Sequence, residues 1–230
     1  MAEPTGRDPR PDPVLVLGSA SPARAALLRS AGISAHVLPS AVDEDAVVTG
    51  AAERAADPHW VTLTLARAKA ADVVAAVRSG RLDHVLGRPP GPDRRVLVVG
   101  ADSMFDVAGR VLGKARSADE VRARWAVMSA RTGVLVTGHA VVDVGSGRSA
   151  EATVATTVRF GSPDPIELEA YIASGEPLEV AGSCTIDGLG GPFVEGIDGD
   201  HTNVIGLSLP TLRRLLRELG VRWTDLWAAR

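Results

Sequence analysis

The stretch from Leu15 to Gly32 restricts the fold of this chain most, because it indicates a strand, a tight turn and a helix in direct succession. A short apolar run breaks at Gly18, and helical residues follow Ser21 and Pro22. Serine is a preferred residue just before a helix, and proline suits the first helical turn. The glycine that ends the stretch stands where helices commonly stop. The segment therefore predicts a strand that passes through a Gly/Ser turn into a helix over residues 22–31.

This turn is a candidate anion-binding site. A turn between a strand and a helix N-terminus gathers backbone N–H groups at the positive end of the helix dipole. Ser19 adds a hydroxyl there, and Arg24 adds a cation in the first helical turn. The segment alone is equally consistent with an ordinary strand–turn–helix connection.

Composition excludes several classes of partner. The 230-residue chain has a formal net charge of −3 and no dense basic run, so no surface for duplex nucleic acid is expected. No apolar run approaches a membrane span, and the N-terminus lacks the apolar core of a signal peptide. We therefore expect a soluble, cytoplasmic protein.

Cys184 is the only cysteine, which excludes an intrachain disulfide, and we interpret it as a small buried side chain. His139 and His201 show no metal-ligand spacing and are interpreted as structural.

The order of elements predicts one α/β domain. Residues 1–12 are rich in Pro, Asp and Arg and are expected to be a disordered lead-in. Residues 13–220 are expected to form a single catalytic domain with an exposed Gly/Pro-rich loop at 79–95, followed by a C-terminal extension at 221–230. Strands and helices alternate early and a hairpin follows, which predicts a mixed sheet with flanking helices. The expected strands cover 15–17, 36–38, 96–99, 134–144 and 152–160, and the expected helices cover 22–31, 59–77, 164–173, 210–219 and a segment that opens at Ser117 with a stripe of Val121, Trp125 and Met128.

Lys69 lies within an apolar stripe of the long helix expected over residues 59–77. At helical spacing it shares a face with Leu65 and Val73. An unpaired buried charge is costly, so the lysine needs a partner. It is either a phosphate ligand in a cleft, a side chain that extends to solvent, or the partner of Asp72 one turn on.

Asp102 follows the apolar strand at 96–99, in the sequence Gly100-Ala-Asp-Ser. This places it at the C-terminal end of that strand, where open α/β sheets bind ligands. A carboxylate there can hold a divalent cation or take a proton from water. The alternative is an aspartate that caps the next segment. Lys114 lies a hairpin's length further on and is expected to return near Asp102, although a single lysine is more commonly a surface residue.

The segment from Gly182 to Gly206 is rich in glycine, with six glycines between positions 182 and 199. Glycine permits positive φ and close backbone approach. Such a loop can wrap a base or a sugar, and it can equally be a plain set of turns.

Taken together, these segments resemble the Maf family of nucleoside triphosphate pyrophosphatases, also called septum-formation inhibitor-like proteins, over about residues 14–219. The motifs that carry the resemblance, by their order and spacing, lie at 17–24, 40–44, 65–70, 100–103, 112–114, 129–131 and 176–209. The resemblance implies a mixed α/β fold with two lobes around a deep cleft, similar to the inosine triphosphate pyrophosphatases, and in many members a homodimer. It also implies hydrolysis of nucleoside triphosphates, including modified ones, to the monophosphate and pyrophosphate with Mg²⁺ or Mn²⁺.

The resemblance further implies roles for individual residues. Asp102 matches the family's catalytic residue, and Glu44 matches the acidic residue near the metal. The resemblance implies that Asp102 is also a ligand of this metal. The residues that match phosphate ligands of the family are Ser19, Arg24, Lys69 and Lys114.

Three departures from the family pattern bear on specificity. Ala23 replaces the usual first arginine after Ser-Pro, and Ser103 replaces the threonine after the catalytic aspartate. Asp187 stands where members selective for dTTP and UTP often have glutamine. The competing hypothesis is a nucleotide-binding regulatory protein of cell division without turnover. Ala23 favours this alternative, and the retention of Asp102 and both lysines disfavours it.

Overall fold

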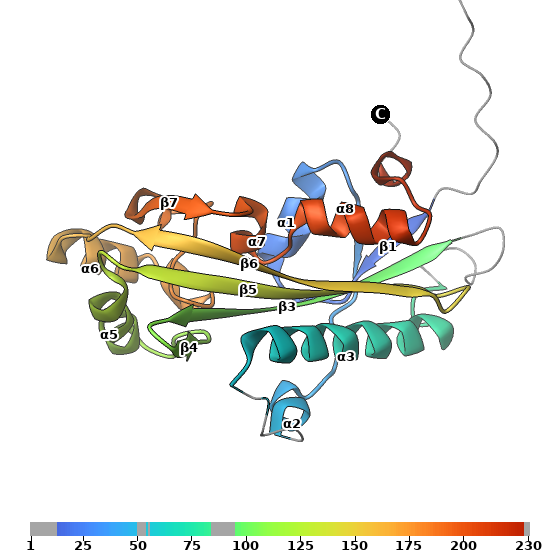
Figure 1. Cartoon of the computed structure of the whole chain (residues 1–230), viewed down its shortest axis with the longest axis horizontal. Coiled ribbons are helices and arrows are strands. Elements are labelled where there is room, and N and C mark those ends of the chain that lie inside the picture. The colour runs from blue at the N-terminus through green and yellow to red at the C-terminus, as the bar shows by residue number, and fades with distance from the viewer. Residues whose placement is uncertain (1–12, 50–53, 55, 84–94, 228–230) are drawn as a thin grey trace, which may run out of the picture.

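The computed structural model describes residues 13–49, 54, 56–83 and 95–227. The lead-in expected over 1–12 and most of the loop expected over 79–95 lie outside these residues. Seven strands form one sheet in the order β2-β1-β3-β5-β6-β7, with β4 paired to β3 (Figure 1). The strands are β1 Val14–Leu17, β2 His36–Val37, β3 Val96–Val107, β4 Arg110–Leu112, β5 Thr132–Asp143, β6 Ser149–Phe160 and β7 Val194–Asp198.

The sheet is mixed, as the sequence predicts. β1 runs parallel to β2 and β3, and every other pair is antiparallel. Helices flank the sheet on both faces: α3 lies along one face, and α1 and α8 lie on the opposite one (Figure 1). The helices are α1 Pro22–Ser30, α2 Glu44–Thr49, α3 Pro58–Arg78, α5 Ala118–Met128, α6 Pro165–Ala173, α7 His201–Ile205 and α8 Leu209–Glu218. None of those described is long and apolar enough to cross a membrane.

Alternation along β1 explains why both faces of this end of the sheet are covered. Leu15 and Leu17 are buried with residues of α1 and α8, among them Leu212. Val16 points the other way and is buried with Val73 of α3. A strand that is buried on both faces needs a continuous apolar run, and β1 has one. Val221 and Leu226, which follow α8, pack into the first of these clusters.

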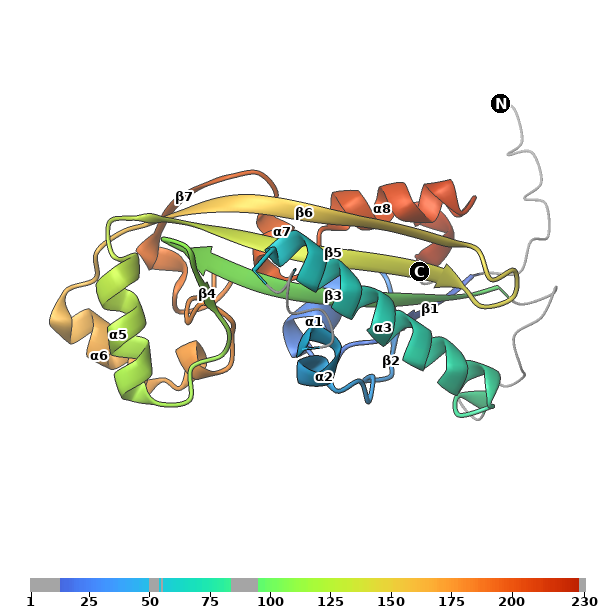
Figure 2. The same cartoon turned by 60° about the horizontal axis from the view of Figure 1, so that its bottom comes forward.

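A third cluster lies at the other end of the long strands, where α5 and α6 cover the sheet (Figure 2). Trp125 of α5 is fully buried and makes edge-to-face contacts with Phe160, Tyr171 and Phe193. The apolar stripe predicted for this helix, Val121, Trp125 and Met128, is buried throughout. The helix begins after Ser117, whose hydroxyl accepts from the amide of Glu120.

β3 is longer than the sequence predicts, and this corrects the position of Asp102. The expected strand ended at residue 99, but β3 continues to Val107 and pairs with β5 from Leu97↔Asp143 to Asp106↔Val134. Asp102 therefore lies within the strand and not at its C-terminal end. Gly100 does not form a turn. It leaves room for α3, since a Cβ at Gly100 would overlap the carbonyl oxygen of Ala66.

Glu44 begins the short helix α2, and Asp43 caps this helix by accepting from the amide of Ala46. The glycine-rich segment contains β7, which pairs with β6, and α7. Both elements lie among glycines and are only five residues long, so the sequence pattern does not predict them.

Candidate active site

One edge of β3 is open between two strand partners. β1 pairs with β3 as far as Leu17↔Val99, and β4 pairs with it only from Phe105↔Leu112. Between these points no strand of the described residues covers this side of β3. Successive side chains point to opposite faces, so Asp102 faces α3 and Ser103 faces α1. The site residues reach this edge from both faces of the sheet.

On the α3 side, Lys69 bridges two carboxylates. Its Nζ lies 2.6 Å from Asp102 Oδ1 and 2.7 Å from Glu44 Oε1. Lys69 and Asp102 are each 8% exposed, whereas more than half of the Glu44 side chain is exposed. Asp72 is not the partner of the lysine, because its carboxylate accepts from the amide of Ala41.

Two glycines bring the lysine to the aspartate. A Cβ at Gly100 would overlap the backbone of α3 at Ala66, and one at Gly138 would overlap it at Thr62. Gly138 lies directly opposite Asp102 in the β3–β5 pairing. Because neither residue has a side chain, α3 packs closely enough for Lys69 to reach the Asp102 carboxylate.

On the α1 side, Arg24 is buried and donates to four protein oxygens. Its Nη1 donates to Ser19 Oγ and to the carbonyl of Ala101, each at 2.9 Å. Its Nε donates to the carbonyl of Gly206 at 2.7 Å, and its Nη2 donates to Ser103 Oγ at 2.9 Å. A guanidinium has five N–H groups, so these contacts use four. Arg24 forms no ion pair with any described residue, so no contact neutralises its charge.

Sequence reasoning missed two members of this network. Thr137, which is fully buried, lies opposite Ser103 in β5, and their hydroxyl oxygens are 2.9 Å apart. Gly206 supplies a carbonyl to Arg24 from the C-terminal end of α7. The hydroxyl of Thr137, after the apolar run at 134–136, is a weak signal, and only the strand register shows its partner.

Residues 14–219 match the family described as Maf-like protein. The chain belongs to this family. A nucleoside triphosphate pyrophosphatase of Streptomyces coelicolor is 51% identical over 220 residues, which cover 96% of this chain and 97% of that protein. Proteins of the same name from Streptomyces avermitilis and Salinispora tropica are each 50% identical, over 94% and 93% of this chain and over 95% and 87% of their own lengths. A solved lipoprotein structure from Neisseria meningitidis matches 72% of this chain and 91% of its own at 14% identity, with a TM-score of 0.23.

Burial governs the electrostatics of this Maf-like protein's site. Burial raises the pKa of Asp102 above its ordinary value, and the neighbouring Lys69 only partly offsets this effect. Burial also lowers the pKa of Arg24. His139 in β5 is neutral, since burial lowers its pKa to about 4, and its Nε2 accepts from the amide of Ser208.

The remaining predicted residues of the Maf-like protein lie apart from these contacts. Lys114 is exposed and follows β4, whose register returns the chain towards Asp102, and its backbone forms a bridge with Ala181. Asp187 is exposed in the loop after Ile186, and Ala23 is half-buried in the first turn of α1. No contact in the described part of the chain joins Lys114 or Asp187 to Asp102.

The two carboxylates that contact Lys69 are suitable ligands for a divalent cation. The described residues contain no group of three or more His, Cys, Asp or Glu side chains placed to hold a metal. Mg²⁺ commonly uses only one or two carboxylates and completes its shell with water and substrate phosphates. Asp102 and Glu44, which share one ammonium, provide such a pair.

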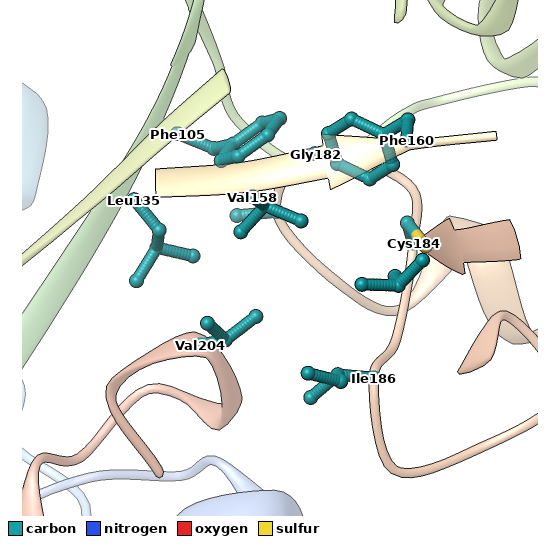
Figure 3. Close-up of a pocket in the computed structure, with 10 residues that line it drawn as sticks. Phe105, Leu135, Val158, Phe160, Gly182, Cys184, Ile186 and Val204 are labelled. Carbon is teal, nitrogen blue, oxygen red and sulfur yellow. The ribbon is translucent and has the colours of Figure 1, made fainter. Parts of the chain in front are cut away.

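A separate apolar pocket lies beside the glycine-rich loop (Figure 3). Its walls come from β3, β5, β6, β7, the loop at 181–186 and α7, and Phe105 of β3 lies two residues after Ser103 in the same strand. Cys184 lines it, and burial raises the pKa of this thiol to about 12. The pocket therefore offers aromatic and aliphatic surface next to the loop that carries Asp187.

Proposed function

We propose that this chain hydrolyses nucleoside triphosphates, standard or modified, to the monophosphate and pyrophosphate. The observation that carries the proposal is the open edge of β3, where a buried carboxylate, Asp102, lies with the buried cations Lys69 and Arg24. Curated relatives that are about half identical over nearly the whole chain are named for this activity. A fold alone would not support a function, but the buried Arg24 forms no ion pair with a described residue and lies beside Ser103, next to Asp102, where an anionic substrate can pair with it.

In the proposed reaction, Arg24 and Lys69 offset the negative charge of the phosphate oxygens, and Lys114 adds a third cation. Asp102 takes a proton from the water that attacks the α-phosphorus. The bond from the α-phosphorus to the oxygen that bridges it to the β-phosphorus then breaks, and pyrophosphate leaves with that oxygen. The raised pKa of Asp102 makes it a stronger base than an exposed carboxylate, which favours proton transfer near neutral pH.

A divalent cation, Mg²⁺ or Mn²⁺, would be held by Asp102 and Glu44 and would supply further charge neutralisation at the phosphates. Lys69 contacts both carboxylates, so uptake of the cation requires Lys69 to exchange them for other acceptors. Phosphate oxygens of the substrate are suitable acceptors for its ammonium.

The direct test is pyrophosphate release from a panel of standard and modified nucleoside triphosphates, with Mg²⁺, with Mn²⁺ and with a chelator. We expect release that depends on the cation. Tight nucleotide binding without pyrophosphate release would instead support the regulatory protein without turnover.

The proposal extends to the setting of the protein. We place it in the cytoplasm, where nucleoside triphosphates are available, with no membrane or duplex nucleic acid as partner. We also propose a homodimer, as the family resemblance implies. Light scattering of the purified chain across a concentration series checks the dimer, and a monomer at every concentration would contradict it.

Lys114→Ala should lower kcat/KM by about 10- to 100-fold, because a charged hydrogen bond to phosphate would be lost. Its melting temperature should change little, since the Lys114 side chain is exposed. Steady-state kinetics and thermal unfolding measure the two effects. Arg110→Ala is the matched control, because Arg110 is an exposed cation in the same hairpin. Unchanged kinetics in Lys114→Ala would make Lys114 a surface lysine only.

Asp187→Gln should shift relative kcat/KM towards UTP and dTTP by about 1–3 kcal/mol, the scale of one mispaired polar contact. An ionised carboxylate only accepts hydrogen bonds and favours base edges rich in N–H groups, such as those of guanine or cytosine. An amide both donates and accepts, and so matches uracil or thymine. A rate panel of UTP, dTTP, CTP, GTP and modified forms on both proteins measures the shift. An unchanged ranking would show that Asp187 does not contact the base.

A further inference from the structure

A single buried arginine joins the segment of Lys114 to the glycine-rich loop. Arg124 of α5 is only 8% exposed. Its guanidinium donates to the carbonyls of Gly113 and Lys114, at 2.5 and 3.1 Å, and to the hydroxyl of Ser183 at 3.1 Å. It also forms an ion pair with Glu120, one turn earlier in the helix, at 2.6 Å. Three of these four acceptors belong to segments outside α5.

Independent contacts hold the same junction. The backbones of Lys114 and Ala181 form an antiparallel bridge. Ser183 is fully buried with a φ of 53°, in the left-handed region that serine rarely adopts. The indole N–H of Trp125 donates to the carbonyl of Ser183 at 3.1 Å. A strained residue persists only where its surroundings fix it, so neighbouring side chains of α5 determine the path of this loop.

The guanidinium suits this junction better than other side chains do. Its planar group presents five N–H donors in a fixed arrangement, so it can reach acceptors on two segments at once. A lysine ammonium in its place would be a compact point charge on a flexible stem. Without this donor, the fully buried hydroxyl of Ser183 would lose a hydrogen-bond partner, which is unfavourable, and the carbonyl of Gly113 would keep only the amide of Gly182.

We propose that Arg124 is a positioning residue for the nucleotide. By fixing the backbone of Lys114 against the glycine-rich loop, it determines where the Lys114 ammonium meets the triphosphate. Arg124 itself does not contact substrate, since its donors are directed to protein acceptors. This inference rests on the proposed function, in which Lys114 binds phosphate.

The test is a double-mutant cycle between Arg124→Met and Lys114→Ala. Displacement of a binding group can cost a factor of about 10 to 100, so Arg124→Met should lower kcat/KM by that amount in the wild-type background. In the Lys114→Ala background the same change should cost less than about threefold, because the group that Arg124 positions is already absent. Equal losses in the two backgrounds would overturn the inference.

Matched variants separate positioning from loss of stability. Arg122→Met removes an exposed arginine of the same helix, which pairs with Glu169 and Asp119, and should leave the kinetics unchanged. Arg124→Lys keeps the charge and most of the side chain, and provides the same cycle if Arg124→Met does not fold. It should raise KM more than it lowers kcat, and wild-type kinetics with a reduced melting temperature would assign Arg124 a structural role only.

Binding of inorganic tripolyphosphate, measured by calorimetry on the same four proteins, separates this inference from the proposed function. If the effects of Arg124→Met and Lys114→Ala on tripolyphosphate binding are additive while the wild type releases pyrophosphate, the role of Arg124 is refuted and the proposed reaction is not. Coupled binding in a wild-type protein that hydrolyses no nucleotide would refute the proposed reaction and retain the role of Arg124.

Discussion

Asp102→Asn should lower the rate of pyrophosphate release by about 100-fold or more, the scale of a lost general base. Asparagine keeps the shape of the side chain but removes its charge and its basicity. The variant should fold normally, because burial already disfavours the ionised form of Asp102, and Lys69 keeps its contact with Glu44.

Steady-state kinetics and thermal unfolding check this expectation together. Asp106→Asn is the matched control, since Asp106 lies in the same strand, outside the site contacts, and should retain wild-type rates. Turnover like that of the wild type in Asp102→Asn would remove Asp102 from the mechanism, whatever its effect on stability.

Lys69→Met should weaken nucleotide binding and rate and also destabilise the fold. Removal of one partner from a buried ion pair leaves the other charge unpaired, at a cost of about 3 kcal/mol in the free energy of unfolding. The double variant Lys69→Met with Asp102→Asn should recover most of that stability, because no buried charge remains unpaired, but it should not recover activity.

This loss of stability should depend on pH. Without the ammonium, the folded-state pKa of Asp102 rises further above its ordinary value of 3.8, because burial and the charge of Glu44 raise it and only the charge of Arg24 still opposes them. A carboxyl group with a raised folded-state pKa binds more protons in the folded protein, so stability falls as pH rises between the two pKa values. The deficit of Lys69→Met relative to the wild type should therefore be larger at about pH 8 than at about pH 5.

Urea unfolding of the four proteins of this cycle at the two pH values measures the effect. Arg67→Met is the control, because Arg67 lies in the same helix in an exposed pair with Glu151, and its loss should cost less than about 1 kcal/mol. A deficit that is the same at both pH values, or that the double variant does not relieve, would show that Lys69 does not stabilise the Asp102 carboxylate.

Local rules explain the elements that the sequence predicted well. The first helix begins where expected because Ser21 accepts from the amide of Arg24 and Pro22 occupies the first turn. The stripe of α5 was predictable because helical spacing alone places its apolar residues on one face. These features depend on residues a few positions apart, so the local sequence is sufficient to predict them.

The need for a partner at Lys69 was also visible in the sequence, but the identity of that partner was not. Helical spacing places the lysine in a buried stripe and offers Asp72 nearby. The structure selects Asp102, 33 positions away, and Glu44 from the start of α2. Sequence order does not specify which distant carboxylates meet a buried cation, because that depends on how α3 packs against β3 and β5.

The sequence by itself determined the mixed α/β class, the strand, turn and helix that carry Ser19 and Arg24, and the place of Lys69 in an apolar helical stripe. Only the tertiary structure decided that β3 continues through Asp102, that Arg24 reaches Gly206, 182 positions along the chain, and that Arg124 joins Lys114 to the glycine-rich loop. The physical reason is the same in each case. A glycine such as Gly100 signals a turn or a close approach equally well, and the choice between them depends on strand register and helix packing between segments that are remote in sequence.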